Sequence, residues 1–510
     1  MIIMSVVRRS FDRCFSLVLA CFFAVYYLAG PTIGGVVAAD QRPNVLFIIS
    51  DDLNNSLGCY DHPLVKSPNI DRLAARGVRF ERAYCQFPLC GPSRNSMLTG
   101  LYPNSTGILS NSQIFRQTIP THLSLSQALR LQGYFAARIG KLYHYNVPKS
   151  VGTNGHDDPG SWELELNPAG CDRLLEEPDI FSLRPGNFGG TLSWYASPRG
   201  DLLHTDGMLA TDAEWVLERC ARDKERPFFL AVGFYRPHTP YVAPKEYFKG
   251  YPQKKMPLVE GVEEDQQDLP ALALGSHKKE HDLLTDDLRQ QAIQAYFASI
   301  TFMDAQVGRV LDALDRLCLA DNTIVVFTSD HGYHLGEHGL WQKMSLFEES
   351  ARVPLIIAAP GMSENGGVAK TPVGLIDLYP TLTELCNIDG PENLQGQNLA
   401  PILKDPTLPG RGWALSQVRR GSNKKQTFGF TLRTPRWRYT EWDGGKQGRE
   451  LYDHENDPLE QKNLADDPAQ AARIAEFADT LHAATKASLP ESGEIPLIRP
   501  GLWAPNLTDP

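Results

Sequence analysis

The feature of this sequence that most constrains the fold is a set of short, almost wholly apolar runs. These runs lie at residues 43–50, 227–233, 323–328 and 353–358. Runs of this length without polar alternation are typical of strands buried on both faces of a parallel sheet. The first run is followed by Asp51 and Asp52, and the third leads into Asp330 and His331. We therefore expect acidic side chains at the carboxyl ends of two such strands.

Helical patterns separate the apolar runs. The clearest one spans about residues 286–317, where apolar residues from Ile293 to Leu314 mostly recur at steps of three and four. Shorter helical patterns lie near residues 69–76 and 124–132. Strands that alternate with helices predict an α/β fold with a large, mostly parallel sheet flanked by helices. Such sheets bind ligands beyond the carboxyl ends of their strands, where the acidic residues are expected.

The last part of the chain has a different pattern. Residues 427–432 and 437–442 alternate apolar and polar side chains, as half-exposed antiparallel strands do. Residues 469–484 form a further helical pattern. The sequence therefore predicts a catalytic α/β domain over residues 40–390 and a smaller C-terminal α+β subdomain with a small antiparallel sheet over residues 391–510.

The N-terminal segment has the layout of a signal peptide. Three arginines precede an almost wholly apolar stretch at residues 14–28, and small residues at 37–39 suit a cleavage site. The apolar stretch is short for a membrane span, and an uncleaved anchor is the alternative. We therefore expect residues 1–39 to direct export to a secreted, periplasmic or lysosome-like compartment. No stable membrane association is expected once they are removed.

Composition and charge exclude several other classes of protein. The chain has 510 residues, 42% hydrophobic and 22% charged, so it is neither disordered nor collagen-like. The net charge of -10 gives no sign of a nucleic-acid partner, because such binders are usually basic. Seven of the nine cysteines lie beyond the leader and none forms a CxxC pair, so no thiolate zinc site is expected. The sequence leaves open whether six of the seven form disulfides.

A candidate nucleophile lies at Cys90. Residues 90–94 read Cys-Gly-Pro-Ser-Arg, and Thr99 and Gly100 follow shortly after. Glycine and proline favour a turn, and the next residues can open a helix, which would place Cys90 at the positive end of the helix dipole. Arg94 adds a fixed positive charge suited to a tetrahedral oxyanion. These residues predict a nucleophile beside an anion-binding loop.

The motif resembles the signature of the type I, formylglycine-dependent sulfatase family. The resemblance extends from Asn44 to about Ala465. It implies an alkaline-phosphatase/sulfatase-like fold, a sulfated saccharide as substrate, and a formylglycine-generating enzyme as the maturation partner. It also implies that Cys90 is converted to formylglycine. The hydrated aldehyde would attack sulfur through one hydroxyl, and loss of the proton of the other would expel sulfate and restore the aldehyde.

The resemblance implies metal ligands at the strand ends. Asp51, Asp52, Asp330 and His331 match the family's metal ligands, together with the residue made from Cys90. Oxygen-rich ligation favours a hard cation, so one Ca²⁺ is expected, with Mg²⁺ or Zn²⁺ as alternatives. The metal would polarise a sulfate oxygen and favour ionisation of the attacking hydroxyl.

Four further residues match active-site motifs of the family. They are Lys141, His144, His238 and Lys343. The resemblance implies that Lys141 holds oxygens of formylglycine or sulfate and that His144 takes a proton in the elimination step. It implies that His238 contacts sulfate and helps to protonate the leaving alcohol, and that Lys343 binds the leaving oxygen. The neighbouring His334 and His338 are expected to have structural or pocket roles.

Several stretches look closest to the iduronate-2-sulfatase branch of the family. They include residues 67–71, 296–299 and 335–339. This branch implies a 2-O-sulfated uronic acid at the non-reducing end of heparan or dermatan fragments. Residues 155–203 and 416–510 match poorly, so another sulfated sugar is an alternative substrate, as is a phosphonate or phosphate monoester. A non-catalytic glycan-binding relative would show damaged motifs, and here they are intact.

Overall fold

The computed structural model describes residues 42–113, 115–155, 157–422 and 425–497. The predicted leader over residues 1–39 lies outside the described residues. From Pro43 onward the chain forms one compact unit, and the boundary near residue 390 stays a prediction. Within the described ranges, every helix is too short or too polar to cross a membrane.

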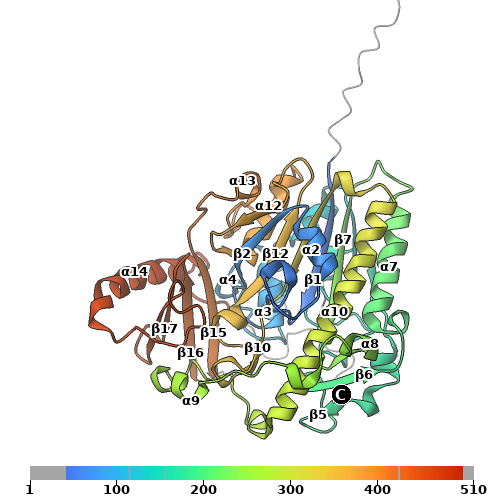
Figure 1. The fold of residues 1–510 in the computed structure, drawn as a ribbon. Coiled ribbons are helices and arrows are strands. Elements are labelled where there is room, and N and C mark those ends of the chain that lie inside the picture. The colour runs from blue at the N-terminus through green and yellow to red at the C-terminus, as the bar shows by residue number, and fades with distance from the viewer. Residues whose placement is uncertain (1–41, 114, 156, 423–424, 498–510) are drawn as a thin grey trace, which may run out of the picture. The chain divides into compact units, whose positions relative to one another are not determined.

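A nine-stranded sheet lies at the centre of this unit, with helices on both faces (Figure 1). Its strands are β1 (Asn44–Asp51), β2 (Val78–Tyr84), β3 (Phe135–Gly140), β4 (Leu164–Leu166), β7 (Phe228–Pro237), β9 (Thr323–Ser329), β12 (Arg352–Ala358), β13 (Gly367–Ala369) and β14 (Val373–Gly374). Their order is β13-β2-β12-β9-β1-β7-β3-β4, and β14 also pairs with β2. All pairings except those of β12 are parallel. The prediction of a mostly parallel α/β sheet is therefore confirmed.

β12 differs from the expectation for its apolar run, because it is antiparallel to both of its neighbours, β2 and β9. The chain leaves β9 at Ser329 and enters β12 at Arg352 with only short elements between them: β10 (His334–Leu335), β11 (Trp341–Gln342) and α11 (Glu348–Ala351). A parallel pair needs a long crossover connection, usually a helix. A strand that starts at the edge where its predecessor ended must run the opposite way.

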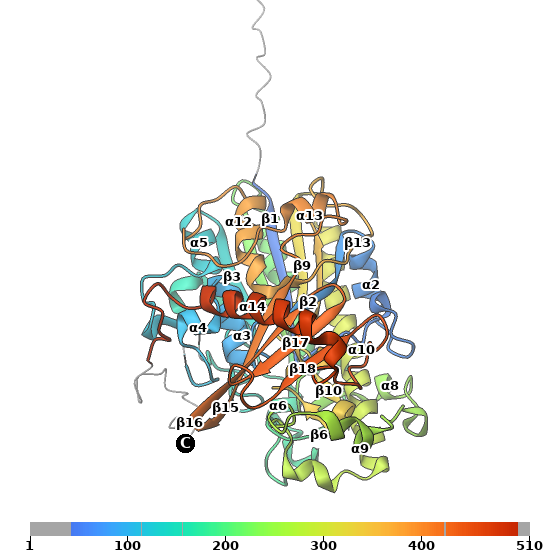
Figure 2. The same cartoon turned by 90° about the vertical axis from the view of Figure 1, so that its left-hand side faces the viewer.

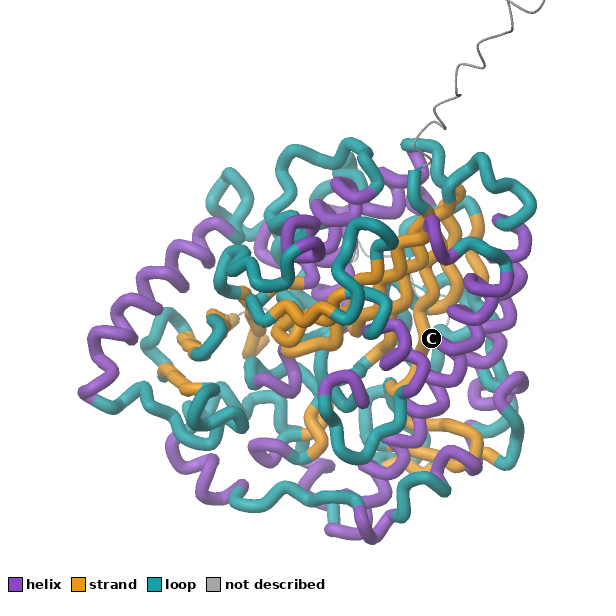
Figure 3. The backbone as a smooth tube through the Cα atoms, turned by 45° about the horizontal axis from the view of Figure 1, so that its top comes forward, coloured by secondary structure: helices purple, strands orange, loops and turns teal. Residues whose placement is uncertain are grey.

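Helices on the two faces of the sheet complete two separate hydrophobic cores. Figure 3 shows the strands of the sheet between the two sets of helices. One face carries α2 (Pro68–Ala74), α7 (Thr205–Cys220) and α10 (Asp286–Arg316); the other carries α3 (Cys90–Thr99), α5 (Leu125–Leu131), α12 (Leu378–Leu385) and α13 (Ala400–Lys404). Alternate residues of β1 divide between the cores: Leu46 and Ile48 join the first, and Val45, Phe47 and Ile49 join the second. Burial on both faces explains why the run lacks polar alternation.

The long helix predicted over residues 286–317 is α10, and its predicted apolar stripe is buried. Thr285 caps its start, because the Thr285 hydroxyl accepts a hydrogen bond from the backbone N–H of Leu288 at 3.3 Å. The remaining short elements are α4 (Pro103–Thr106), α6 (Cys171–Leu174), α8 (Lys245–Phe248), α9 (Val262–Asp265) and a three-stranded sheet of β5 (Phe181–Ser182), β6 (Ser193–Ser197) and β8 (Tyr241–Pro244).

The C-terminal region contains a four-stranded antiparallel sheet and one helix, as predicted. The strands are β15 (Ala414–Ser422), β16 (Lys425–Arg433), β17 (Trp437–Trp442) and β18 (Arg449–Asp453). The helix α14 (Ala471–Ala487) lies across this sheet (Figure 2). Leu481 of α14 packs with Leu432, Tyr439 and Leu451 of the strands. The alternating pattern of the sequence is therefore that of a sheet with one covered face.

Candidate active site

The candidate active site lies at the carboxyl edge of four neighbouring strands. β3, β7, β1 and β9 are adjacent and parallel, so their ends meet at one edge of the sheet. The predicted residues at this edge are Lys141 after β3, His238 after β7, Asp51 and Asp52 at the end of β1, and Asp330 and His331 after β9. The topology thus brings together side chains that are far apart in the sequence.

Asp51 and Asp52 are consecutive, yet both belong to the same cluster of buried groups. Neighbouring side chains of an extended strand point to opposite faces. Asp52 has a φ of 65°, in the left-handed region, which ends the strand and redirects its carboxylate. The Tyr296 hydroxyl from α10 donates to the carbonyl oxygen of Asp52 at 2.8 Å and holds this turn. One ligand atom each of Asp51, Asp52 and His238 consequently lie within 4.8 Å of one another.

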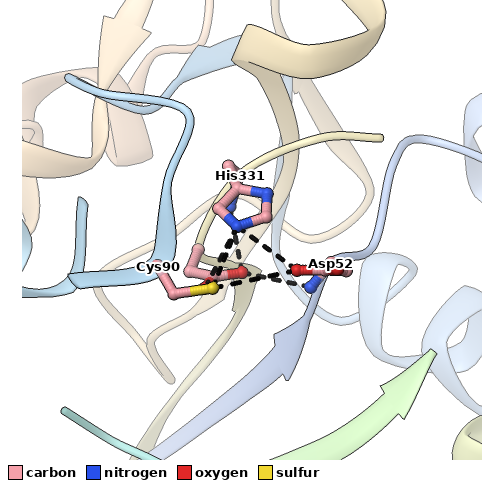
Figure 4. Close-up of side chains that lie close together, drawn as sticks. Asp52, Cys90 and His331 are labelled. Atoms are coloured by element: carbon pink, nitrogen blue, oxygen red, sulfur yellow. Dashed lines mark hydrogen bonds and ion pairs between the residues drawn. The ribbon is translucent and has the colours of Figure 1, made fainter. Parts of the chain in front are cut away.

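Cys90 is the first residue of α3, as the sequence predicts, and is 1% exposed. Its Sγ atom lies 3.4 Å from Nε2 of His331 and 3.9 Å from Oδ1 of Asp52. Figure 4 shows the three side chains facing one another. Cys90 has a free thiol in the described structure. The structure therefore places a thiol at a helix N-terminus, against the residues that end β1 and β9.

The charges around Cys90 favour the thiolate. Burial by itself would raise the pKa of the thiol, but Lys141 and Lys343 hold this pKa well below its usual range. Burial likewise disfavours the imidazolium of His331, but the neighbouring Asp330 raises its pKa to about 9. The Asp330 carboxylate therefore favours the protonated, positively charged form of His331.

Arg94 is fully buried and ties the strand ends together. Its Nη2 donates to Oδ1 of Asp51 at 3.0 Å, and its Nε donates to Oδ2 of Asp330 at 2.9 Å. Its Nη1 donates to the carbonyl oxygens of Lys141 and Leu142 at 2.7 and 3.1 Å. Since all three guanidinium nitrogens have acceptors inside the protein, the structure directs Arg94 toward the carboxylates rather than toward open space.

Two lysines bring positive charge to the same carboxylates. Nζ of Lys141 lies 2.7 Å from Oδ2 of Asp51. Nζ of Lys343 lies 2.5 Å from Oδ1 of Asp52 and 3.1 Å from Sγ of Cys90. The residues on either side of Lys343, Gln342 and Met344, have φ values of 70° and 74°. This left-handed backbone forms the turn that presents Lys343 to the site.

The two predicted histidines lie at the same edge. Nε2 of His238 lies 3.7 Å from Oδ2 of Asp52, and its Nδ1 lies 2.6 Å from the carbonyl oxygen of Thr239. His144 is half-buried in the loop after β3, three residues beyond Lys141. The structure thus brings His238 into the cluster and places His144 in an adjoining loop.

Comparisons with known proteins agree with this geometry. A family model described as Sulfatase matches residues 43–388, and one described as N-sulphoglucosamine sulphohydrolase, C-terminal, matches residues 336–487. A protein from Formosa agariphila named Sulfatase is 33% identical over 443 residues, which cover 83% of each chain. The chain belongs to the sulfatase family.

Two further matches, one in sequence and one in structure, give information about this sulfatase. Human iduronate 2-sulfatase is 31% identical over 511 residues, covering 83% of this chain and 91% of the human one. The crystal structure of the phosphonate monoester hydrolase of Agrobacterium radiobacter has a TM-score of 0.73 at 24% identity, and the match covers 88% of this chain and 96% of that chain. The first match supports hydrolysis of sulfate esters, and the second shows the shared fold.

The residues of this sulfatase fit a bound cation. Asp52, Cys90, Asp330 and His331 each place one ligand atom within 4.8 Å of the others. Oδ2 of Asp52 is buried and has no hydrogen-bond partner among the described residues. A buried carboxylate oxygen is costly to leave unpaired. Carboxylate oxygens with one imidazole suit a hard or borderline divalent ion.

The sequence did not identify Lys278, which lies beside this sulfatase's predicted residues. Its Nζ donates to the carbonyl oxygen of Gly190 at 2.6 Å and to Oε1 of Gln342, the neighbour of Lys343. Burial lowers the pKa of Lys278 to about 8, and the nearby charge of Lys343 acts in the same direction. Lys278 belongs to no motif or periodic pattern, so only the tertiary structure could reveal it.

Proposed function

We propose that this sulfatase removes the 2-O-sulfate of a uronic acid at the non-reducing end of glycosaminoglycan fragments. The observation that carries the proposal is the position of Cys90, which lies buried at a helix N-terminus between His331, Asp52 and Lys343. The choice of sugar is supported by the 31% identity to human iduronate 2-sulfatase. It is also supported by the sequence stretches that resemble that branch.

Cys90 would supply the nucleophile after its conversion to formylglycine. The hydrated aldehyde provides one hydroxyl that attacks sulfur and a second that allows sulfate to leave. Lys343, whose Nζ lies 3.1 Å from Sγ, is placed to stabilise negative charge on an oxygen at this position. Because Cys90 is 1% exposed, a formylglycine-generating enzyme would have to act before the chain folds.

Asp51, Asp52, Asp330 and His331 would hold one Ca²⁺, together with the residue made from Cys90. When bound, the ion polarises a sulfate oxygen and favours ionisation of the attacking hydroxyl. Burial would raise the pKa of Asp330, but Arg94 holds it well below its usual range. Arg94 therefore acts in this proposal as a positioning residue that keeps the carboxylates ionised and in place.

The other polar residues would bind the sulfate and move protons. Lys141 lies against Asp51, where its charge can hold sulfate oxygens. The Nδ1 atom of His238 faces a backbone carbonyl, which leaves Nε2 toward the site. This Nε2 lies 3.7 Å from Oδ2 of Asp52 and would donate a proton to the leaving alcohol. His144 would take the proton that is released in the elimination step.

The proposal includes export and maturation. Residues 1–39 would direct the chain to a secreted, periplasmic or lysosome-like compartment, and the mature enzyme would have no stable membrane association. The maturation enzyme and the sulfated saccharide are its expected partners, and no nucleic acid is expected to bind.

The test is sulfate release from a panel of substrates by enzyme that is co-produced with a formylglycine-generating enzyme. The panel contains disaccharides with uronate 2-sulfate, glucosamine 6-sulfate or galactosamine 4-sulfate, and an aryl phosphonate. We expect release from the uronate 2-sulfate. Preferred release from another sugar would overturn the choice of uronate, and preferred cleavage of the phosphonate would overturn the sulfatase reaction.

A further inference from the structure

A basic cavity lies beside the reaction centre. It has a volume of about 470 Å³ and is lined by Lys149, Arg184 and Asn187, among other residues. Its wall comes partly from the insert at residues 155–203, which the family motifs do not cover. The chemistry proposed for the reaction centre therefore does not by itself explain this cavity.

Direct contacts connect this cavity to the reaction centre. The carbonyl oxygen of Gly189, in the cavity wall, accepts a hydrogen bond from the Thr239 hydroxyl at 2.8 Å, next to His238. The carbonyl oxygen of Gly190 accepts from Nζ of Lys278, which also donates to Gln342, next to Lys343. The cavity wall thus abuts the loops that carry two of the proposed catalytic residues.

The wall is held in a fixed position. A Cβ atom at residue 189 would lie 1.5 Å from the carbonyl oxygen of Val147, so only glycine fits this close approach. A Cβ atom at residue 190 would meet nothing within 4 Å, so this side of the wall is open. The backbone of the wall therefore packs directly against Val147 at residue 189 and is open at residue 190.

The cavity carries positive charge without matching acidic groups. Arg173 is neutralised by Glu177, since their side chains form an ion pair at 2.9 Å. Lys149 and Arg184 are exposed, and neither forms an ion pair within the described part of the chain. Lys278 donates only to neutral oxygens, although the charge of Glu280 lies close enough to favour its protonated form. This excess is notable on a chain with a net charge of -10.

We propose that this cavity is a subsite for a second anionic group of the substrate, carried by the sugar next to the one whose sulfate ester is cleaved. Arg184 and Lys149 bind the anion, and Lys278 lies between this subsite and the reaction centre. Asn187 in the wall provides an amide for a sugar hydroxyl. The occupant is an acidic oligosaccharide whose second group is a carboxylate or a sulfate. This inference rests on the proposed saccharide sulfatase activity.

The experiment measures kcat and KM for wild-type enzyme and for the Arg184→Gln/Lys149→Gln double variant. The substrates are an aryl sulfate, a sulfated disaccharide with a neutral second sugar, and matched disaccharides whose second sugar carries a carboxylate or a sulfate. We expect the double variant to raise KM about tenfold for the substrates with a second anion, with kcat unchanged. KM for the aryl sulfate and the neutral disaccharide stays the same. The two anionic substrates distinguish carboxylate from sulfate as the natural partner.

Lys404→Gln is the matched control, because it removes one exposed lysine from α13, outside the cavity. An equal KM for every substrate in wild type and double variant would overturn the subsite. So would an equal rise for substrates with and without the second anion. Failure of the underlying activity is distinguishable, because wild-type enzyme would then release sulfate from no saccharide of the series.

Discussion

Two clusters of buried charge in this molecule differ in whether all of their carboxylate oxygens already accept hydrogen bonds. The candidate active site contains Oδ2 of Asp52, which accepts no hydrogen bond from the described residues and lies 3.7 Å from Nε2 of His238. The second cluster, which we call the inter-sheet cluster, connects the nine-stranded sheet to the C-terminal sheet. It consists of Glu348, Arg433, Arg438, His454 and Glu460.

Every carboxylate oxygen of the inter-sheet cluster has a partner. Oε1 of Glu348 accepts from the Tyr84 hydroxyl at 2.9 Å, and its Oε2 pairs with Arg433 and Arg438. Oε1 of Glu460 pairs with Arg438 and His454, and its Oε2 accepts from the backbone N–H of Glu348. Although Glu348, His454 and Glu460 lie close enough together to suggest a metal site, their oxygens are already used. Buried charge alone therefore does not mark a cation site.

We expect the substitution of Asp330 to have the strongest effect on metal binding and turnover. Asp330→Asn removes a proposed ligand charge, so we expect bound Ca²⁺ to fall well below one ion per chain and turnover to fall by about 10³-fold or more. Elemental analysis and sulfate release measure the two effects. Asp312→Asn, at an exposed carboxylate, is the control. Unchanged metal content would remove Asp330 from the ligand set.

The second prediction concerns the stability that the inter-sheet cluster gives the fold. Arg438→Met leaves Glu348 and Glu460 short of a buried partner, and we expect the free energy of unfolding to fall by about 3–5 kcal/mol. Arg72→Met, which breaks the exposed pair with Asp312, should cost about 1 kcal/mol or less. Denaturant unfolding measures both. If Arg438→Met unfolded no more easily than Arg72→Met, the inter-sheet cluster would not stabilise the fold.

The third prediction is a weaker effect, a pH dependence of fold stability caused by His338, which lies next to the inter-sheet cluster. Burial opposes the charge of His338, but its hydrogen bond with Asp265 raises its pKa to about 9 from the ordinary 6.5. A raised histidine pKa stabilises the fold fully below about pH 6.5, and this stability is lost as the pH rises through 9. The difference corresponds to about 3 kcal/mol. We expect thermal unfolding of wild type to shift to lower temperature over this range, and His338→Gln to flatten that profile. Parallel profiles for the two proteins would contradict the assignment.

The sequence predicted many of the residues that meet at the carboxyl edge of the sheet, because local patterns encode their positions. The apolar runs locate β1 and β9 and hence Asp51, Asp52 and Asp330. The prediction of a helix that opens near Cys90 is confirmed, but Gly91 and Pro92 lie within the first turn of α3 rather than in a turn before it. The sequence did not predict that β12 is antiparallel to its neighbours, because burial on both faces does not specify the direction of a strand. The sequence also did not predict that Arg94 binds Asp51 and Asp330, since a sequence cannot show whether a guanidinium faces a carboxylate or a ligand.

The contacts of Lys278 and the inter-sheet cluster depend on pairings between distant segments. Glu348 and Arg438 are 90 residues apart, and Lys278 and Gly190 are 88 apart. No periodic pattern or local motif connects positions so far apart. Such pairs are fixed by how the sheets and loops pack together, which is a property of the whole fold.

The proposed reaction depends on conversion of Cys90 to formylglycine, and this conversion can be varied experimentally. The enzyme is produced with and without a formylglycine-generating enzyme, and the fraction converted is measured by mass spectrometry of the peptide that contains Cys90. Sulfate release is measured on the same preparations, with Cys90→Ala as the inactive reference. We predict that turnover rises in proportion to the converted fraction. Equal turnover by enzyme with unconverted Cys90 would show that formylglycine does not carry the reaction.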